Sequence, residues 1–130
     1  MFNKGEKATF SKTITESDVS VFAGVSGDFN PIHINKIYAE QTMFKKRIVH
    51  GALLNSYISN VIGMQLPGTG TIYLEQNSKF VKPVYIGDTI TASVEIEDII
   101  KEEKGILKLS TNVVNQKGEL CLEGYAIVKV

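Results

Sequence analysis

The sequence contains one cysteine, so an internal disulfide bond is excluded. A lone cysteine is usually a small, buried hydrophobic residue, and we expect Cys121 to pack in the core. Residues 1–7 also lack the apolar core of a signal peptide. Together these absences predict a cytoplasmic protein that is stabilised by its core alone.

Long apolar runs and an excess of charge are also missing. Polar residues interrupt the longest helix-like stretch at Asn55, Ser56, Ser59 and Asn60, which leaves no segment that could cross a bilayer. The formal net charge is +0, and the basic residues are scattered apart from Lys45–Arg47. Nucleic-acid binding relies on a concentrated basic surface. We therefore expect no membrane and no nucleic acid as partner, and favour a small-molecule ligand.

The composition that is present is that of a globular protein. The 130 residues are 43% hydrophobic and 22% charged. A chain of this length buries roughly two thirds of the surface that its unfolded form exposes, enough for a core without a structural metal. No internal repeat or low-complexity segment occurs. We expect one domain over residues 1–130.

The first third of the chain alternates helix signals with turn formers. Thr15 and Asp18 have the spacing of a capping box, which predicts a helix that ends near Gly24 to Gly27. Residues 26–33 are dense in turn formers and predict a loop with exposed polar side chains. Two further segments are expected, a short helix around residues 36–42 and an exposed connection over residues 44–51.

A helix with two unlike faces is expected from Ala52 to Met64, resuming at Gly51. At about 100° per residue, one face is bulky and the other small. The bulky face holds Leu54, Tyr57, Ile58, Val61 and Ile62, and the small face holds Ala52, Ser56, Ser59 and Gly63. The small face fits either a close packing contact or a groove.

The rest of the chain has the character of β-strands. Residues 71–81 are rich in β-formers, and alternating apolar positions then recur in three runs separated by short turns. These positions are Ile90 to Ile96, Leu107 to Val113 and Leu120 to Val130. Because short turns can join only antiparallel neighbours, we expect an antiparallel meander. Its apolar face needs a cover, and the helix at residues 52–64 is the obvious one.

Asp28 and His33 lie five residues apart in the turn-rich segment, ahead of His50 and Gly51. An Asp and a His that face one pocket can position a water, and the pKa of His suits proton transfer near neutrality. Asp28 also fits a simple turn, and His50 fits a hydrogen bond across a connection, so the residues alone leave both interpretations open. Gly51, at a helix start, offers a free N–H that could bind a thioester oxygen.

Four segments carry motifs of a known family. Residues 27–33 (Gly-Asp-Phe-Asn-Pro-Ile-His), with Ala39 further on, resemble the hydratase signature of the MaoC-like family. Residues 48–53 resemble the start of that family's central helix. Residues 70–74 and 80–88 are similar to it as well, so the resemblance spans essentially the whole chain.

The resemblance implies an α+β hot-dog fold, in which an antiparallel β-sheet wraps around a long central helix. It also implies a homodimer or higher homo-oligomer whose subunits pair edge to edge. The implied activity is that of an R-specific enoyl-CoA hydratase. Such an enzyme converts trans-2-enoyl-CoA reversibly to (R)-3-hydroxyacyl-CoA, with the acyl-CoA as substrate and with no cofactor and no metal.

The resemblance also implies roles for individual residues. Asp28 and His33 would hold the attacking water, supported by Ser59 and Asn30, and Gly51 with His50 would receive the thioester carbonyl. The expected acyl-pocket residues are Ala52, Ser56 and Gly63, and the basic residues that could meet the phosphates of coenzyme A are Lys45, Lys46, Arg47 and Lys82. At Asn60 the sequence departs from the smaller residue expected, which affects the shape of the acyl pocket.

Three other functions remain open. An acyl-CoA thioesterase of the same fold would direct water at the carbonyl carbon instead of the double bond. A non-catalytic acyl-CoA-binding module would keep the pocket without turnover. A metal site could be built from Asp28, His33 and His50, although their spacing matches no common zinc pattern.

Overall fold

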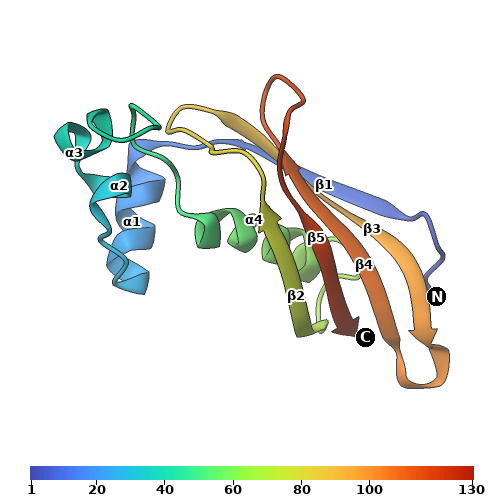
Figure 1. The fold of residues 1–130 in the computed structure, drawn as a ribbon. Helices are drawn as coiled ribbons and strands as arrows, with labels where there is room; N and C mark the ends of the chain where they lie inside the picture. Colours follow the sequence, from blue (N-terminus) through green and yellow to red (C-terminus); the bar gives the residue numbers. More distant parts are fainter.

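The computed structural model describes residues 1–130 as one sheet with four α-helices (Figure 1). The strands are β1 (Lys7–Thr13), β2 (Ile72–Phe80), β3 (Thr89–Lys101), β4 (Ile106–Val114) and β5 (Leu120–Lys129). The helices are α1 (Glu16–Ser26), α2 (Pro31–Ile34), α3 (Lys36–Glu40) and α4 (Gly51–Met64), with a short 3-10 turn at Glu102–Lys104. The sheet curls around α4, whereas α1 to α3 lie together beyond one end of it.

The sheet is antiparallel throughout, in the order β1-β3-β4-β5-β2. The expected meander of β3, β4 and β5 is confirmed, with Leu109 paired to Ile96 on one side and to Ala126 on the other. Strand β1 pairs with β3, and β2 pairs only with β5. Strand β2 is therefore an edge strand, and its second row of backbone groups has no partner within the chain.

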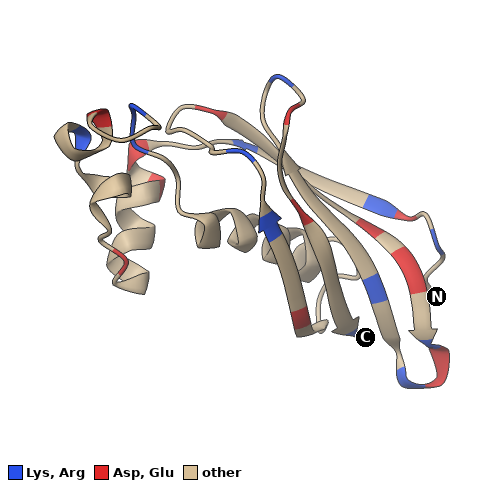
Figure 2. Ribbon diagram, in the orientation of Figure 1, with Lys and Arg blue, Asp and Glu red and all other residues tan.

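Helix α4 begins at Gly51, as expected, and carries no charged residue (Figure 2). It packs against β3, β1 and β4. Its bulky face is buried in the core, as the spacing predicted, through Leu54, Tyr57, Ile58, Val61 and Ile62. Each fully buried side chain of this kind contributes about 1.5–3 kcal/mol. The small face is not covered by another element, so close packing does not explain it.

Helix α1 has the capping box that the sequence predicted. The Oγ1 atom of Thr15 accepts a hydrogen bond from the N–H of Asp18, and the Asp18 carboxylate accepts one from the N–H of Thr15. Gly27 ends the helix with φ of 81°, a left-handed conformation that favours glycine. This turn directs the chain into Asp28.

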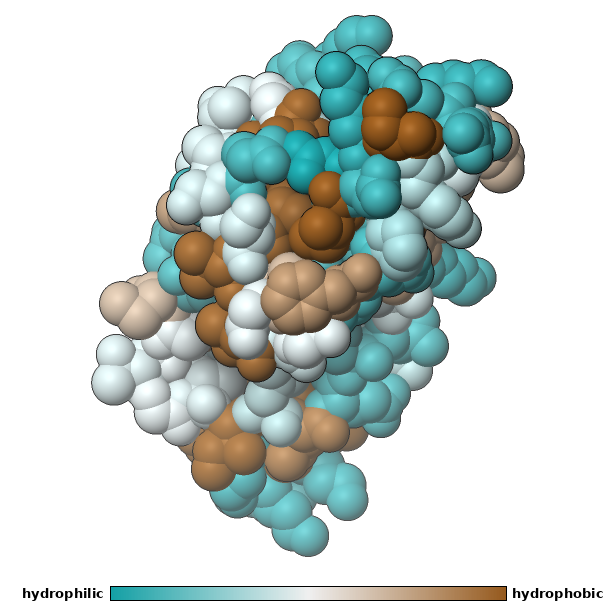
Figure 3. Space-filling model, turned by 90° about the vertical axis from the view of Figure 1, so that its left-hand side faces the viewer, coloured by the Kyte–Doolittle hydropathy of each residue, from teal (hydrophilic) through white to brown (hydrophobic).

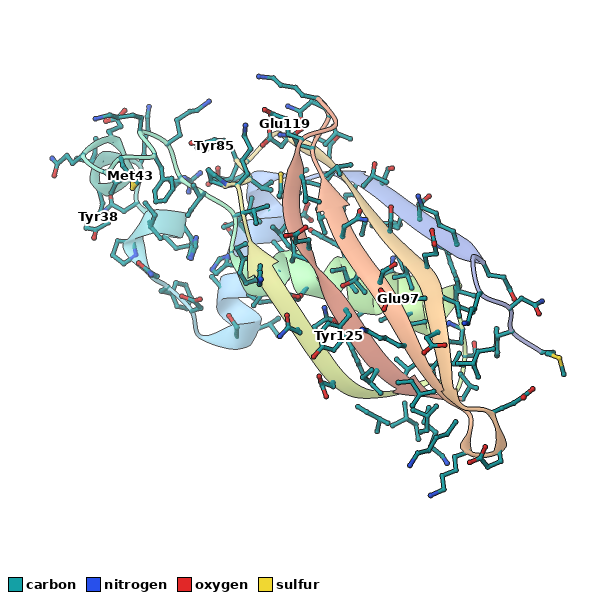
Figure 4. The ribbon with its side chains drawn as sticks, turned by 45° about the vertical axis from the view of Figure 1, so that its right-hand side comes forward. Tyr38, Met43, Tyr85, Glu97, Glu119 and Tyr125 are labelled. Carbon is teal, nitrogen blue, oxygen red and sulfur yellow. The ribbon has the colours of Figure 1, made fainter.

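Two sequence expectations about exposed segments are wrong. Residues 26–33 are not simply a loop, because Pro31–Ile34 form α2 and His33 is only 8% exposed. Residues 44–51 are not an exposed connection, because Val49 and His50 are buried. The reason is tertiary pairing. The N–H of Val49 donates to the Val84 carbonyl at 2.7 Å, and Ile48 forms an isolated β-bridge with Tyr85. Tyr85 lies between the sheet and the end of the molecule that holds α1 to α3 (Figure 4).

Cys121 is fully buried in the core, as expected. At the end of the molecule formed by α1 to α3, several hydrophobic side chains are exposed at the surface (Figure 3). The most exposed of these are Val25 and Met43. No helix is both long enough and apolar enough to cross a membrane.

Candidate functional site

Helix α2 holds His33 in place. Pro31 at the first helical position has a fixed φ that suits a helix start, and the Asn30 side chain caps the helix by accepting from the N–H of Ile32. The Oδ1 atom of Asn30 therefore already accepts a hydrogen bond from the backbone of α2. The Nδ1 atom of His33 lies 2.8 Å from the carbonyl oxygen of Ile48. Because a carbonyl only accepts, Nδ1 carries the hydrogen, and Nε2 of the neutral ring keeps a lone pair.

The surroundings of His33 lower its pKa below the usual 6.5. Burial is the largest cause, because it disfavours the charged ring, and nearby His50 acts in the same direction. The hydrogen bond to Ile48 and the charge of Asp28 oppose this shift without reversing it. His33 is therefore neutral near pH 7 and able to accept a proton.

Asp28 lies on the exposed turn that follows α1. Its N–H donates to the Ser26 hydroxyl at 3.1 Å, and its Oδ1 atom accepts from the N–H of Asn30 at 3.2 Å. A side-chain oxygen of Asp28 and ring nitrogens of His33 and His50 lie within 4.8 Å of one another. One water molecule can bridge groups at this separation, since each of its hydrogen bonds spans about 2.8 Å.

His50 is the residue just before α4 and is 1% exposed. Its Nε2 atom lies 2.9 Å from the carbonyl oxygen of Asp28, and its ring stacks on that of His33 with centroids 3.9 Å apart. Its side chain does not line the groove described next. The His50 side chain thus contacts the Asp28 turn, and its contact with the thioester stays a prediction.

A groove of about 530 Å³ lies in front of His33. Most of its wall is hydrophobic, and the lining residues are His33, Phe44, Ile48, Val49, Gly51, Leu54, Phe80, Val81, Lys82, Pro83 and Val84. A Cβ atom added at Gly51 would lie 2.7 Å from Cε1 of Phe80, so glycine is what lets the ring approach the helix start. The groove thus combines an apolar wall with one buried, neutral histidine.

Gly51, the first residue of α4, lines this groove and brings a hydrogen-bond donor to it. The N–H groups of Gly51 and Ala52 donate to no other atom of the chain, and His50 provides no side-chain cap. Free N–H groups at a helix start carry partial positive charge. A carbonyl oxygen that gains negative charge would be stabilised beside Gly51.

A second hollow, of about 500 Å³, lies between the small face of α4 and β2. It is lined by Asn55, Ser56, Ser59, Tyr73, Leu74, Glu75 and Gln76, none of which lines the first groove. Within one chain, the structure does not bring Ser59 beside Asp28 and His33. Ala52 and Gly63 line neither hollow, so the small face forms a groove only at Ser56 and Ser59.

The four basic residues expected to meet the phosphates of coenzyme A fall into two groups. Lys45 and Lys46 border a shallow hollow beside Tyr85, with the Lys46 ammonium 4.9 Å from the ring centre of Tyr85. Arg47 pairs with Glu16 and Lys82 pairs with Glu119, the latter labelled in Figure 4. Of these four residues, Lys45 and Lys46 form no ion pair and remain available to an anionic ligand.

The geometry favours hydrogen bonding over metal binding at Asp28, His33 and His50. The lone pair of an imidazole nitrogen lies in the plane of its ring. The two rings stack with centroids 3.9 Å apart and planes tilted by only 27°, so their lone pairs lie in two separate, similarly oriented planes, which disfavours binding of one ion by both rings. In addition, one nitrogen of each ring donates to a main-chain carbonyl.

Apart from His33, Gly51 and Lys82, the residues that line the groove were not predicted as site residues. Phe44, Ile48 and Phe80 come from segments far apart in the sequence. Ile48 and Phe80 each begin a segment that resembles the family, residues 48–53 and 80–88, whereas Phe44 lies in no such segment. Phe22, which contacts the His50 ring with centroids 4.9 Å apart, had no signal beyond its place on an amphipathic helix.

Comparison with known proteins places the chain in a family. The family model described as "MaoC like domain" matches residues 3–117. The chain belongs to the MaoC-like family. The expected α+β hot-dog fold is confirmed, because this MaoC-like chain superimposes on the "(R)-hydratase from A. caviae involved in PHA biosynthesis" with a TM-score of 0.95. That match has 43% identity and covers 99% of this chain and 97% of the other.

Two curated relatives of this MaoC-like chain carry the name "(R)-specific enoyl-CoA hydratase". The protein from Rhodospirillum rubrum is 46% identical over 127 residues, which cover 98% of this chain and 87% of the relative. The protein from Aeromonas caviae is 44% identical over 126 residues, covering 97% and 93%. The similarity extends over nearly the full length in both cases.

Proposed function

We propose that this protein is an (R)-specific enoyl-CoA hydratase, which adds water reversibly to trans-2-enoyl-CoA and forms (R)-3-hydroxyacyl-CoA. One observation carries the proposal. A buried, neutral His33 lies within bridging distance of the Asp28 carboxylate, at a hydrophobic groove where α4 begins. Relatives with this name, 46% and 44% identical, support the same activity.

In the proposed reaction, a water molecule donates one hydrogen bond to Nε2 of His33 and the other to the carboxylate of Asp28. This arrangement points a lone pair of the water oxygen at C3 of the enoyl group. As the C3–O bond forms, the proton of the water moves to His33. Asp28 keeps the water oriented and stabilises the positive charge that develops on the ring.

The electrons of the double bond then move onto the thioester oxygen, which becomes an enolate. The N–H of Gly51 is proposed to stabilise that charge, because Gly51 lines the groove and is the first residue of α4. His33 returns its proton to C2 and the carbonyl forms again. The sum of these steps is the addition of one water, so the proposed chemistry needs no cofactor.

The substrate is proposed to be an acyl-CoA. The apolar groove wall fits the enoyl group, and Lys45 with Lys46 border the nearby surface where the phosphates of coenzyme A could bind. Arg47 and Lys82 contribute less in this proposal, since each is already paired with a carboxylate. Ser56 and Ser59 line the second hollow and stay candidates for the acyl pocket.

The second candidate activity is thioester hydrolysis. One experiment distinguishes it from hydration. The purified protein is incubated with crotonyl-CoA while the absorbance of the conjugated enoyl thioester and the free thiol are followed together. Hydration removes the absorbance without releasing thiol. Stoichiometric thiol release would support the thioesterase instead, and binding without any turnover would support a non-catalytic module.

We propose that the protein works as a homodimer that pairs along β2. This edge strand exposes Ile72, Leu74 and Phe80, and its outer backbone groups have no partner in the chain. Such an edge is open to pairing with a second strand. We also propose the cytoplasm as its compartment, where a single reduced thiol such as Cys121 is stable.

A further inference from the structure

The turn that carries Asp28 is tied to the rest of the molecule by one long-range hydrogen bond. Within residues 27–30, the other hydrogen bonds all reach residues no more than four positions away, such as Ser26 and Ile32. The exception is the bond between the Asp28 carbonyl oxygen and Nε2 of His50, 2.9 Å long. The position of Asp28 relative to α4 therefore depends on His50.

The His50 ring is held from both sides. Phe22 contacts it edge-on, with ring centroids 4.9 Å apart, and His33 stacks on it at 3.9 Å. Because the Asp28 carbonyl can only accept, Nε2 of His50 must carry the hydrogen. Its Nδ1 atom is buried and has no hydrogen-bond partner. A buried polar atom without a partner costs folding free energy, so stability alone does not explain a histidine here.

We infer that His50 is a positioning residue, which holds Asp28 at a fixed distance from His33 and from the N–H of Gly51. It reaches Asp28 through Nε2, supports His33 through stacking, and precedes Gly51 in the chain. His50 thus contacts two of the groups that the proposed reaction uses, Asp28 and His33, and directly precedes the third, Gly51. The inference rests on the proposed hydratase function, and it assigns to His50 a role without substrate contact.

The chain offers a matched pair of substitutions at this position. In His50→Gln, the side-chain nitrogen is as many bonds from the backbone as Nε2 of histidine, so it can still donate to the Asp28 carbonyl. In His50→Asn, the nitrogen corresponds to Nδ1 and stops short of that carbonyl. Both variants lose the ring, so the difference between them reports the hydrogen bond.

For crotonyl-CoA hydration, His50→Asn is expected to lower kcat about 10- to 100-fold, the scale on which misplaced catalytic groups slow a reaction. Its KM should stay close to that of the wild type, because His50 does not line the groove. His50→Gln should recover most of the lost kcat. Equal kcat values for the two variants, per folded molecule, would overturn the inference. If His50→Asn does not fold, His50→Phe replaces it, because it keeps an aromatic ring and lacks the donor.

The protonation of His50 gives a test that needs no activity. Long-range ¹H–¹⁵N spectra of the wild-type protein should show the Nε2–H form of the ring, whereas an Nδ1–H form would overturn the inference. The outcomes also separate the two proposals. An inactive wild-type protein contradicts the hydratase function, whereas an active wild type with equally active Gln and Asn variants contradicts the role of His50 alone.

Discussion

His33 and His50 stack with their ring centroids 3.9 Å apart, yet each bonds to a different main-chain carbonyl. His33 donates to Ile48 and leaves its other nitrogen for chemistry. His50 bonds to the carbonyl of Asp28 and leaves its other nitrogen buried without a partner. In the proposed reaction the two rings therefore have different roles: His33 exchanges a proton, whereas His50 fixes the position of Asp28.

Asp28→Asn is expected to fold normally and to lose at least about 100-fold in turnover, the usual scale for a positioned acid or base. The amide oxygen of asparagine can still accept the hydrogen bond from the N–H of Asn30. The negative charge that orients the water is removed. Steady-state kinetics with crotonyl-CoA provides the measurement, with the thermal unfolding midpoint as a control for folding. Near-normal hydration by this variant would refute the role of Asp28.

The activity is expected to fall on the acidic side with a midpoint below pH 6.5. The pKa of His33 is lowered from 6.5, mainly by burial, and only the neutral ring can accept a proton from water. The activity is therefore retained as the pH falls to about 6.5 and lost as it passes through the lowered pKa. A profile of kcat/KM against pH measures the midpoint, and an NMR titration of the His33 ring assigns it. A midpoint above 6.5 would contradict this account.

Gly51→Ala tests the start of α4. The added methyl group would lie 2.7 Å from Cε1 of Phe80, so the ring must move and the groove wall beside the Gly51 N–H must change. Because Phe80 is 53% exposed, its ring has room to move and the protein should still fold. We expect kcat/KM to fall about tenfold or more.

The matched control for this substitution is Gly24→Ala in α1. A methyl group there meets no atom within 4 Å, and it should leave activity unchanged while stabilising the helix by about 0.4–1 kcal/mol. Equal kcat/KM for the two alanine variants would show that the approach of Phe80 to Gly51 has no catalytic importance.

Leu74→Lys tests the proposed homodimer. Leu74 is 53% exposed on the edge strand β2, and a lysine placed on an edge opposes pairing with a second strand. Light scattering coupled to size exclusion should give a dimer for the wild type and a monomer for this variant. Ile100→Lys, on β3 and 44% exposed, is the control that should stay dimeric. A monomeric wild type would contradict the proposal.

Local sequence signals predicted much of the fold. The capping box of Thr15 and Asp18, the start of α4 at Gly51 and the alternation along β3 to β5 are all seen in the structure. Each depends on residues close in the sequence, whose spacing alone indicates a helix cap, a helix face or a buried side of a strand.

The segments that were predicted wrongly depend on distant contacts. Val49 is buried because the chain pairs with Val84, and no neighbouring residue signals that pairing. His33 lies in a single turn of helix, which is too short to have a periodic pattern. The hydrogen bond of His50 to Asp28 and its contact with Phe22 likewise join residues far apart in the sequence, so they could not be predicted from local signals.

The configuration of the product tests the central claim most directly. Crotonyl-CoA is incubated with the wild-type protein, the thioester is cleaved chemically, and the released 3-hydroxybutyrate is resolved by chiral chromatography. An (R)-specific hydratase yields the (R) enantiomer alone, without enzymatic release of thiol. Formation of the (S) enantiomer, of a racemate, or of free thiol in place of the hydroxy acid would contradict the account.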